Sequence, residues 1–230
     1  VSLAGNLRDY YFVYRLGEIT EVKDAFYEGS YSGFVNSPEE SVNYVSAHDN
    51  ETLFDIVMYK VDQSLTLQER IRVNWLAMSI IAFSQGIPFF HAGDEVLRSK
   101  SLDRDSYNSG DWFNRLDFTY ETNNFGVGLP GAAKNESKWD MMRPLLANPD
   151  LKPSKEQIMA TVEHMKAILS IRMSTPLFRL QSGEEIQDRV QFYNTGLEQV
   201  PGVIVMEIQD LEGARQLDKN FKRVIVVVNS

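Results

Sequence analysis

The sequence predicts an α/β fold with parallel strands, on the basis of three observations. Residues 42–46 contain strand-forming side chains, and residues 87–91 form a second short apolar run. A helical segment, 66–84, separates the two runs. Both are mostly apolar runs and not alternating ones, which is typical of parallel strands covered on both faces. The order strand, helix, strand indicates the βαβ unit of a parallel barrel or an open sheet.

The helix over 66–84 is predicted from its start and its composition. Thr66 followed by Glu69 forms a capping box, in which each side chain satisfies a backbone donor at the helix start. Apolar residues then occur on almost every side of the helix, so we expect it to be largely buried. Gly86 follows the predicted end.

A second capping box, Ser154 with Gln157, begins a helix over 155–173 that ends before Pro176. The pattern then changes to short strand-like runs separated by turns, at 188–193, 202–208 and 223–228. We therefore expect a domain boundary near residue 176 and an antiparallel β unit after it.

Two segments show little regular periodicity, residues 1–40 and residues 96–153. Loops longer than about 15 residues usually serve a function. The aromatic residues Tyr107, Trp112 and Trp139 suit a sugar-binding surface, because a pyranose ring presents an apolar face to an aromatic ring. The alternative is that they only pack the loop against the protein.

Composition excludes several classes of protein. The chain has 230 residues, 43% of them apolar, and no run near the roughly 20 apolar residues of a membrane span. A net charge of −9 argues against a nucleic-acid partner. The absence of cysteine excludes disulfides and thiol catalysis, and three histidines make a multi-histidine metal site difficult to build.

The ends of the sequence predict an internal piece of a longer protein. No initiator Met or targeting segment is found at the start, and a strongly β-forming run lies almost at the end. The alternative is a complete protein with a C-terminal edge strand.

The chemistry is expected in residues 48–50, the His-Asp-Asn cluster that follows the first predicted strand. Loops after parallel strands line the active face of an α/β barrel. One carboxylate and one imidazole can stabilise a charged sugar transition state, but they cannot supply both the nucleophile and the proton donor. A metal phosphohydrolase site is the alternative from another class, but it needs a further His upstream, and none precedes His48.

Several motifs together resemble one family. Residues 44–50, YVSAHDN, resemble the fourth signature segment of the α-amylase superfamily, glycoside hydrolase family 13, and residues 86–95, GIPFFHAGDE, resemble its eighth-strand segment. Residues 97–114, LRSKSLDRDSYNSGDWFN, and 119–130, TYETNNFGVGLP, are similar to pullulanases and especially to the plant limit dextrinases. The resemblance runs from residues 4–9 to the last predicted strand.

The resemblance implies a fold and an activity. Residues 1–176 would be the C-terminal part of a (β/α)8 TIM barrel, with strands seven and eight and the last helix, and residues 177–230 would begin an antiparallel β-sandwich domain. The family hydrolyses α-1,6 branch bonds in starch, pullulan and limit dextrins with retention. Its nucleophile Asp and acid/base Glu lie in upstream segments that this chain does not contain, so we expect the chain alone to be inactive.

The resemblance leaves two alternative functions open, and it implies a partner and a cellular location. Another hydrolase of the α-amylase superfamily and a non-catalytic glucan-binding relative are the competing interpretations. The partner would be an α-glucan, with no nucleic acid and no membrane, and the location a plastid. No cofactor is certain; calcium is possible in the longer protein, although no ligand cluster here identifies it.

The resemblance assigns roles to residues of this sequence. Asp49 corresponds to the family's third acidic residue, which would stabilise the oxocarbenium-like transition state, and His48 would donate to the same sugar hydroxyls. Substrate contacts are expected from Asn50, Arg104, Tyr107, Trp112, Asn135 and Trp139.

Some roles have structural alternatives. Asn50 could only cap the strand end, and Arg104 could form a salt bridge with a neighbouring aspartate: Asp103, Asp105 or Asp111. Asp94 and Glu95 are expected to hold their loop through hydrogen bonds, and His91 to be a packed, hydrogen-bonded core histidine.

Overall fold

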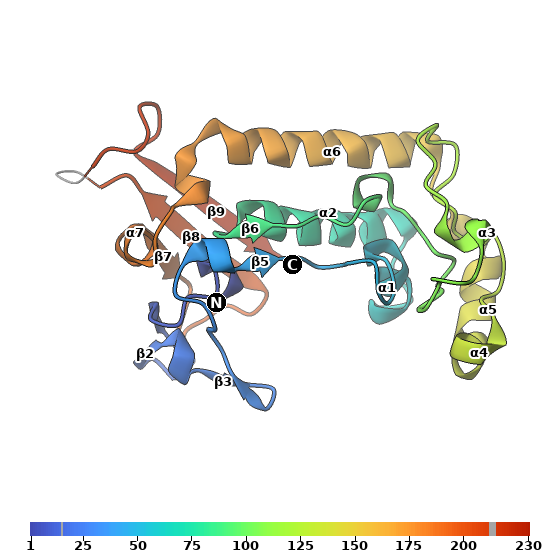
Figure 1. Cartoon of the computed structure of the whole chain (residues 1–230), viewed down its shortest axis with the longest axis horizontal. Helices are drawn as coiled ribbons and strands as arrows, with labels where there is room; N and C mark the ends of the chain where they lie inside the picture. Colours follow the sequence, from blue (N-terminus) through green and yellow to red (C-terminus); the bar gives the residue numbers. More distant parts are fainter. Residues whose placement is uncertain (15, 212–214) are drawn as a thin grey trace. The chain divides into compact units, whose positions relative to one another are not determined.

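A computed structural model describes residues 1–14, 16–211 and 215–230 (Figure 1). The chain divides into two compact units, and each is described by itself. The first unit contains residues 1–43, 79–89 and 168–230, and the second contains residues 44–78 and 90–167. The structure is a mixed α/β arrangement of helices and small sheets, as the sequence predicts.

The first unit contains the predicted parallel strand pair. Strand β5 (Val42–Asn43) pairs in parallel with β6 (Ile87–Pro88), and helices α1 (Leu53–Lys60) and α2 (Leu67–Phe83) lie between them in the chain. The βαβ order is therefore confirmed. Both strands are shorter than the predicted ranges 42–46 and 87–91, because the ladder ends with the bond from the Phe89 N–H to the Asn43 carbonyl, 2.8 Å.

The prediction that these strands are covered on both faces is wrong for this chain. Val42 is 48% exposed, Ile87 45% and Phe89 44%. Within the described residues, β5 and β6 have only each other as sheet partners. A strand loses its solvent contact only where neighbouring strands and covering layers are present.

A three-stranded antiparallel sheet forms after residue 176. It has the order β7 (Val190–Tyr193), β8 (Val203–Gln209) and β9 (Arg223–Asn229). The three predicted strand-like runs are confirmed, but the first begins two residues late, because helix α7 (Gly183–Arg189) occupies the preceding residues. Ser182 caps this helix by accepting from the Glu185 N–H, 3.1 Å.

The sheet packs one face into the core of the first unit. Met206 and Ile208 of β8 are fully buried, as is Leu177 of the 3-10 turn Pro176–Arg179. The N-terminal residues 1–40 contribute Leu7 and Tyr10 to the same core. The predicted boundary at residue 176 concerns domains of a longer protein and stays a prediction.

The sequence predicted an irregular segment over the first 40 residues, and the structure corrects this prediction. They form two short hairpins, β1 (Tyr11–Val13) with β2 (Ile19–Glu21) and β3 (Phe26–Tyr27) with β4 (Ser30–Tyr31). The 3-10 turn Val22–Asp24 connects the hairpins, and two more, Ser2–Ala4 and Pro38–Glu40, lie before the first and after the second. Pairing of only two or three residues a strand leaves almost no periodicity for a sequence pattern to reveal.

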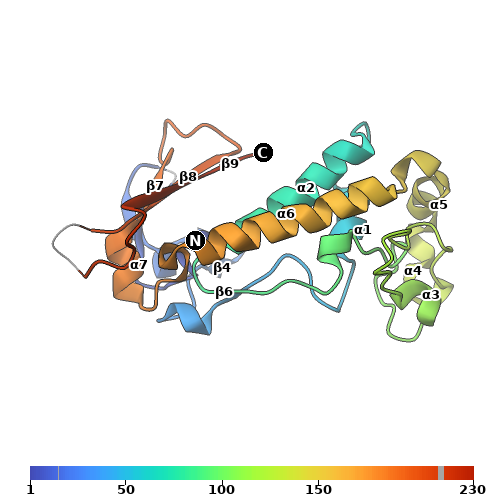
Figure 2. The ribbon, with the colours of Figure 1, turned by 90° about the horizontal axis from the view of Figure 1, so that it is seen from above.

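The second unit is helical. Its core combines α1 and α2 with α6 (Lys155–Ser174), whose Ile158 is fully buried. Helices α2 and α6 run side by side (Figure 2), and the Trp75 indole donates to the Thr161 hydroxyl, 2.9 Å. Both predicted capping boxes are confirmed: the Thr66 N–H donates to Glu69 at 2.7 Å, and the Ser154 N–H donates to Gln157 at 2.9 Å.

Three expectations about this unit need correction. Helix α2 is not buried on every side: Trp75 and Leu76 are partly buried, and Gln68, Glu69 and Arg72 are exposed. The segment 96–153 contains three short helices, α3 (Asp111–Asn114), α4 (Ala132–Asn135) and α5 (Trp139–Ala147), and the 3-10 turns Glu136–Lys138 and Pro149–Leu151. A further 3-10 turn, Asp94–Val96, leads into it. Helix α1 was not expected, because eight residues are too few for a clear helical period.

No helix in the described part of the chain is both long and apolar enough to span a membrane.

Candidate active site

The two segments that follow the parallel strands in the chain are bound to each other in the second unit. The Ser46 hydroxyl donates to the Asp94 carboxyl, 3.0 Å. The Lys100 ammonium donates to the His48 carbonyl, 3.4 Å. The Arg104 Nε donates to Asn50 Oδ1, 3.2 Å. The sequence motifs around positions 44–50 and 86–104 therefore build one site from two stretches of chain.

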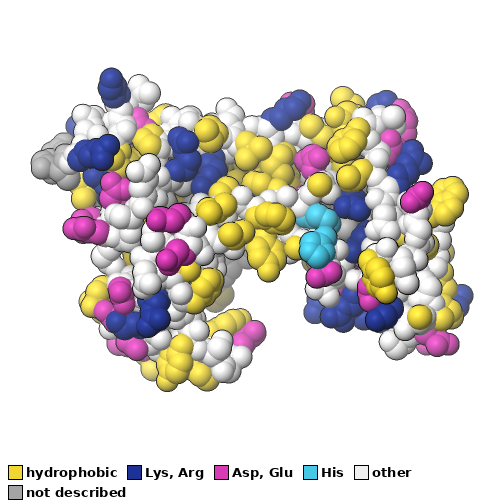
Figure 3. Space-filling model, viewed as in Figure 1, with side chains coloured by type: hydrophobic (Ala, Val, Ile, Leu, Met, Phe, Trp, Pro, Cys, Tyr) yellow, Lys and Arg dark blue, Asp and Glu magenta, His cyan; other side chains and the backbone are white. Residues whose placement is uncertain are grey.

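His48 and Asp49 lie exposed at the centre of this site. Their side chains are 84% and 82% accessible, and His48 Nδ1 lies 3.2 Å from Asp49 Oδ1. Histidine is visible on the face shown in Figure 3, next to acidic and basic side chains. An exposed imidazole and carboxylate that contact each other can offer a polar ligand both a donor and an acceptor.

Asn50 and Arg104 extend the site on one side. Asn50 adopts a left-handed backbone conformation, φ 60°, and its side-chain oxygen accepts from Arg104. Among the described residues, Arg104 forms no ion pair with Asp103 or Asp111, and Asp105 pairs with Lys134 instead, at 3.2 Å. The salt-bridge alternative for Arg104 is therefore not what the structure shows.

Asn135 and Trp139 are placed differently from the other predicted contacts. Asn135 is 2% exposed; its amide donates to Asp103 at 3.0 Å and its oxygen accepts from the Arg104 N–H at 3.3 Å. The Trp139 indole donates to the Pro130 carbonyl, 2.8 Å, and the Arg143 guanidinium lies over its ring. The polar groups of both side chains are used inside the unit, so in this structure they support the loop. Their substrate contacts stay a prediction.

Tyr107 and Trp112 present free aromatic surface. Tyr107 is 83% exposed and Trp112 is 70% exposed. Trp112 lines an open hollow of about 500 Å³ together with Asp111, Asn114 and Arg115. This geometry allows a sugar ring to pack against Trp112.

Asp94 and His91 form a buried layer next to the exposed pair. Burial raises the pKa of Asp94 to about 7, against the opposing effect of hydrogen bonds from Ser46 and from the His91 N–H. Burial, and then the positive charges of Arg98 and Lys100, lower the pKa of His91 to about 4. His91 lies 3.3 Å from an Arg98 nitrogen, so it is a buried, contacted histidine, as predicted.

The loop roles predicted for Asp94 and Glu95 are confirmed by their hydrogen bonds. Asp94 accepts from the His91 N–H at 3.2 Å, and Glu95 accepts from the Gly93 N–H at 2.9 Å.

The sequence analysis did not predict the buried residues, Asp55 and Glu51, that join the segments of this site. Asp55 is fully buried and accepts from the Ser99 hydroxyl, 2.5 Å, and from the Lys100 N–H, 2.7 Å. Glu51 pairs with Lys138 at 3.1 Å. The Thr-x-x-Asp spacing of Thr52 and Asp55 was an available signal, since it is typical of a helix start.

No group of three or more His, Asp or Glu side chains in the described ranges is arranged to hold a metal ion. Apart from the exposed Asp49, the supporting carboxylates Asp55 and Glu51 are already bound to a hydroxyl and a backbone N–H group, and to a lysine, respectively. The described residues therefore form no carboxylate cluster that could bind calcium, and no chemical step is assigned to that ion.

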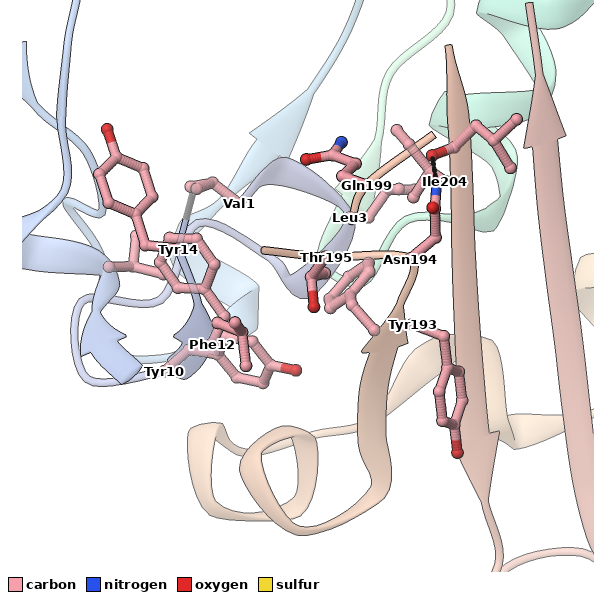
Figure 4. Close-up of a pocket in the computed structure, with 14 residues that line it drawn as sticks. Val1, Leu3, Tyr10, Phe12, Tyr14, Tyr193, Asn194, Thr195, Gln199 and Ile204 are labelled. Atoms are coloured by element: carbon pink, nitrogen blue, oxygen red, sulfur yellow. Dashed lines mark hydrogen bonds between the residues drawn. The ribbon is translucent and has the colours of Figure 1, made fainter. Parts of the chain in front are cut away.

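A separate pocket of about 270 Å³ lies in the first unit (Figure 4). Its walls are mostly aromatic and aliphatic, and the hydroxyls of Tyr10 and Tyr193 are bonded to Val190 and Glu207. The Asn194 amide donates to the Val203 carbonyl, 2.7 Å. The pocket contains none of the predicted site residues, and most of its polar groups are already paired.

Comparison with known proteins identifies the family. Residues 120–230 match the family model described as "Alpha-1,6-glucosidases, pullulanase-type, C-terminal". The whole chain is 50% identical to "Pullulanase 1, chloroplastic" of Arabidopsis thaliana and 35% identical to "Pullulanase" of Klebsiella pneumoniae. The chain belongs to the pullulanase family.

The pullulanase likeness extends to structure. The crystal structure of Klebsiella pneumoniae pullulanase complexed with maltotriose matches 99% of this chain with a TM-score of 0.93 and 37% identity. The chain spans only 24% of the Arabidopsis pullulanase, 21% of the Klebsiella pullulanase and 22% of the Klebsiella structure. It therefore corresponds to less than a quarter of the length of each of these relatives.

Proposed function

We propose that this chain contributes part of the active site of a retaining glycoside hydrolase that cleaves α-1,6 branch bonds. One observation carries the proposal. In a member of the pullulanase family, an exposed His48–Asp49 pair lies where two segments that follow parallel strands are bound together. The nucleophile and the acid/base carboxylate would come from other parts of the longer protein.

In this mechanism Asp49 carries the electrostatic role. The transition state of glycoside hydrolysis has positive charge on the sugar ring, and a carboxylate already fixed near that ring stabilises it without reorganisation. His48 donates to hydroxyls of the same sugar. Arg104, held by Asn50, binds the neighbouring sugar, and Tyr107 and Trp112 offer aromatic surface to the glucan chain.

The fold proposed for the longer protein follows the resemblance. Strands β5 and β6 would be strands seven and eight of a (β/α)8 barrel, α6 its last helix, and residues 177–230 the start of a β-sandwich. The substrates would be starch, pullulan and limit dextrins, in keeping with the maltotriose named for the Klebsiella structure. A plastid location is proposed because the Arabidopsis relative is named chloroplastic.

The test is the Asp49→Asn substitution in the full-length protein, with pullulan as substrate. Loss of one preorganised electrostatic contact costs about 10² to 10³ in kcat, so we expect a fall of that size in the release of reducing ends. Asp140→Asn, on α5, is the matched control and should leave kcat unchanged.

Two outcomes would contradict the proposal. Full activity in Asp49→Asn would remove Asp49 from the mechanism. Binding of maltotriose without any hydrolysis by the unsubstituted full-length protein would make it a glucan-binding relative instead.

A further inference from the structure

We propose that Lys100 is a positioning residue that orients Asp49 through the carbonyl group of His48. The inference rests on the proposed function, because it assigns Lys100 a task in placing the catalytic carboxylate. Lys100 would not touch the glucan. It would hold the peptide group that leads into Asp49.

The burial of Lys100 is unusual for a lysine. The residue is 2% exposed, whereas lysines are almost never fully buried unless they are paired. No Asp or Glu within the described ranges lies at ion-pair distance from its ammonium group, and the His48 carbonyl is the acceptor found for it, at 3.4 Å. Burying a charge in this way is costly, so its retention calls for a specific role.

Lys138 provides a contrast in the same unit. It is an ordinary ion-paired lysine, 3.1 Å from Glu51 and 32% exposed. Its charge is balanced by a carboxylate, so no special task is needed to explain it.

The backbone of Lys100 is also held in place, at the opposite end of the residue from its ammonium group. Its N–H donates to Asp55 at 2.7 Å, and the neighbouring Ser99 hydroxyl donates to the same carboxyl group at 2.5 Å. Asp55 is on α1, which begins four residues after Asp49. Lys100 therefore bridges the helix that follows Asp49 and the carbonyl that precedes it.

The loop that carries Lys100 is strained. Leu97, Ser101 and Leu102 have φ values of 56°, 52° and 66°, which residues other than glycine rarely adopt. Such conformations persist only where the surroundings enforce them, and they are concentrated at functional sites. All three residues are buried, so the loop is held in this form by its packing.

The His48 carbonyl belongs to the planar peptide group whose nitrogen is that of Asp49. Fixing the carbonyl oxygen restrains the plane of that group and the position of the Asp49 Cα, while α1 restrains the chain that follows Asp49. Together these two restraints limit the directions in which the Asp49 side chain can leave the backbone. The Asp49 side chain itself is 82% exposed, and among the described residues its one ion-pair contact within 4 Å is with the His48 imidazole. Its direction therefore depends on the backbone.

The experiment is a double-mutant cycle in the full-length protein, with kcat and KM measured on pullulan. Lys100→Met keeps the length and bulk of the side chain but removes its donors. We expect kcat to fall about 10- to 100-fold with KM nearly unchanged, because a displacement of about 1 Å in a catalytic group costs on the order of 100-fold. In the Asp49→Asn background the same substitution should have almost no further effect, since there is no carboxylate left to orient.

Two further variants complete the test. Lys100→Gln retains a donor without the charge and should keep more activity than Lys100→Met. Lys166→Met replaces an exposed lysine on α6 that pairs with Glu163, and it should leave kcat and KM unchanged.

The outcomes separate the inference from the proposed function. An equal fall in kcat from Lys100→Met in both backgrounds, or a change confined to KM, would overturn the positioning role while leaving Asp49 catalytic. If neither Lys100 variant folds, Lys100 stabilises the unit as a whole and the positioning role is also overturned. Full activity in Asp49→Asn would refute the proposed function itself.

Discussion

At the scale of single residues, the site lies next to two buried titratable groups whose pKa values are shifted by burial in opposite directions. Asp94 and His91 are 5% and 9% exposed, and burial disfavours the charged form of each. The pKa of Asp94 is therefore raised to about 7 and the pKa of His91 is lowered to about 4. Near pH 6 the structure holds a neutral acid and a neutral imidazole next to an exposed carboxylate–histidine pair.

The Asp94→Asn substitution tests this directly. Between the ordinary carboxyl pKa near 4 and the folded value of about 7, the folded state holds a proton that the unfolded state has lost. The free energy of unfolding should therefore fall as pH rises through this window, by at most about 1.4 kcal/mol per pH unit. Asn cannot titrate, so the variant lacks this fall.

The measurement is denaturant unfolding of both proteins from pH 4 to pH 7. His91 has the opposite effect between pH 4 and 6.5, but it is present in both proteins and cancels in their difference. The stability advantage of the unsubstituted protein should therefore decrease with pH. A difference that stays constant across the window would show that Asp94 is already ionised at pH 4.

At the scale of elements, the start of a short helix holds the backbone next to the site. Helix α1 has eight residues, and its cap, Thr52, comes three residues after Asp49. The Thr52 hydroxyl accepts from the Asp55 N–H at 3.1 Å. The same turn of helix thus holds the chain that follows the His48–Asp49 pair and presents the Asp55 carboxyl group to the Lys100 loop.

Thr52→Ala should destabilise the second unit by about 1 kcal/mol, because the helix start loses its side-chain acceptor. Thr52→Ser retains the hydroxyl and is the control, with a smaller loss from the missing methyl group. Thermal unfolding of the two variants measures the difference. Equal losses would mean that packing of the methyl group, and not the cap, stabilises α1.

The β5–β6 pair depends on a glycine. Gly86 has φ +89°, and an added Cβ would lie 2.9 Å from the Ser41 carbonyl and 3.0 Å from the Asn43 amide nitrogen. Gly86→Ala should therefore cost about 1–3 kcal/mol in the free energy of unfolding. Gly131→Ala is the control: its φ is −59° and an added Cβ meets nothing within 4 Å, so its effect should be close to zero. A Gly86 variant as stable as the control would show that the loop accommodates the methyl group.

At the scale of the whole molecule, the two units have separate cores. The first gathers Leu7, Leu177 and Ile208, and the second gathers Phe54, Ile71 and Ile158. All predicted site residues belong to the second unit. The function proposed above needs two carboxylates in addition to Asp49, and that proposal places them in other parts of the longer protein.

We predict that the 230-residue chain alone does not hydrolyse pullulan, because it supplies one of the three carboxylates of the proposed mechanism. The assay is the release of reducing ends by the purified chain, compared with the full-length protein at equal concentration. Release by the chain alone that disappears in Asp49→Asn would contradict the prediction.

The predictability of the structure from sequence varied with the kind of signal. The capping boxes at Thr66 and Ser154 identified the starts of α2 and α6, because capping is a local interaction between residues three apart. The hairpins of the first 40 residues and α1 escaped prediction, since elements of two to eight residues are too short for a period to appear. The exposure of β5 and β6 was also misjudged, because burial depends on neighbouring layers that the residues of the strand do not encode.

The sequence by itself determined the family, the parallel strand order and the candidate pair His48–Asp49, because these depend on residue identity, spacing and local hydrogen bonding. Only the tertiary structure decided how the pair is supported. The contacts of Asp55 with Ser99, of Lys100 with His48 and of Arg104 with Asn50 each join residues more than 40 positions apart. Such contacts form only when the chain folds back on itself, and no local pattern in the sequence predicts which distant side chains will meet.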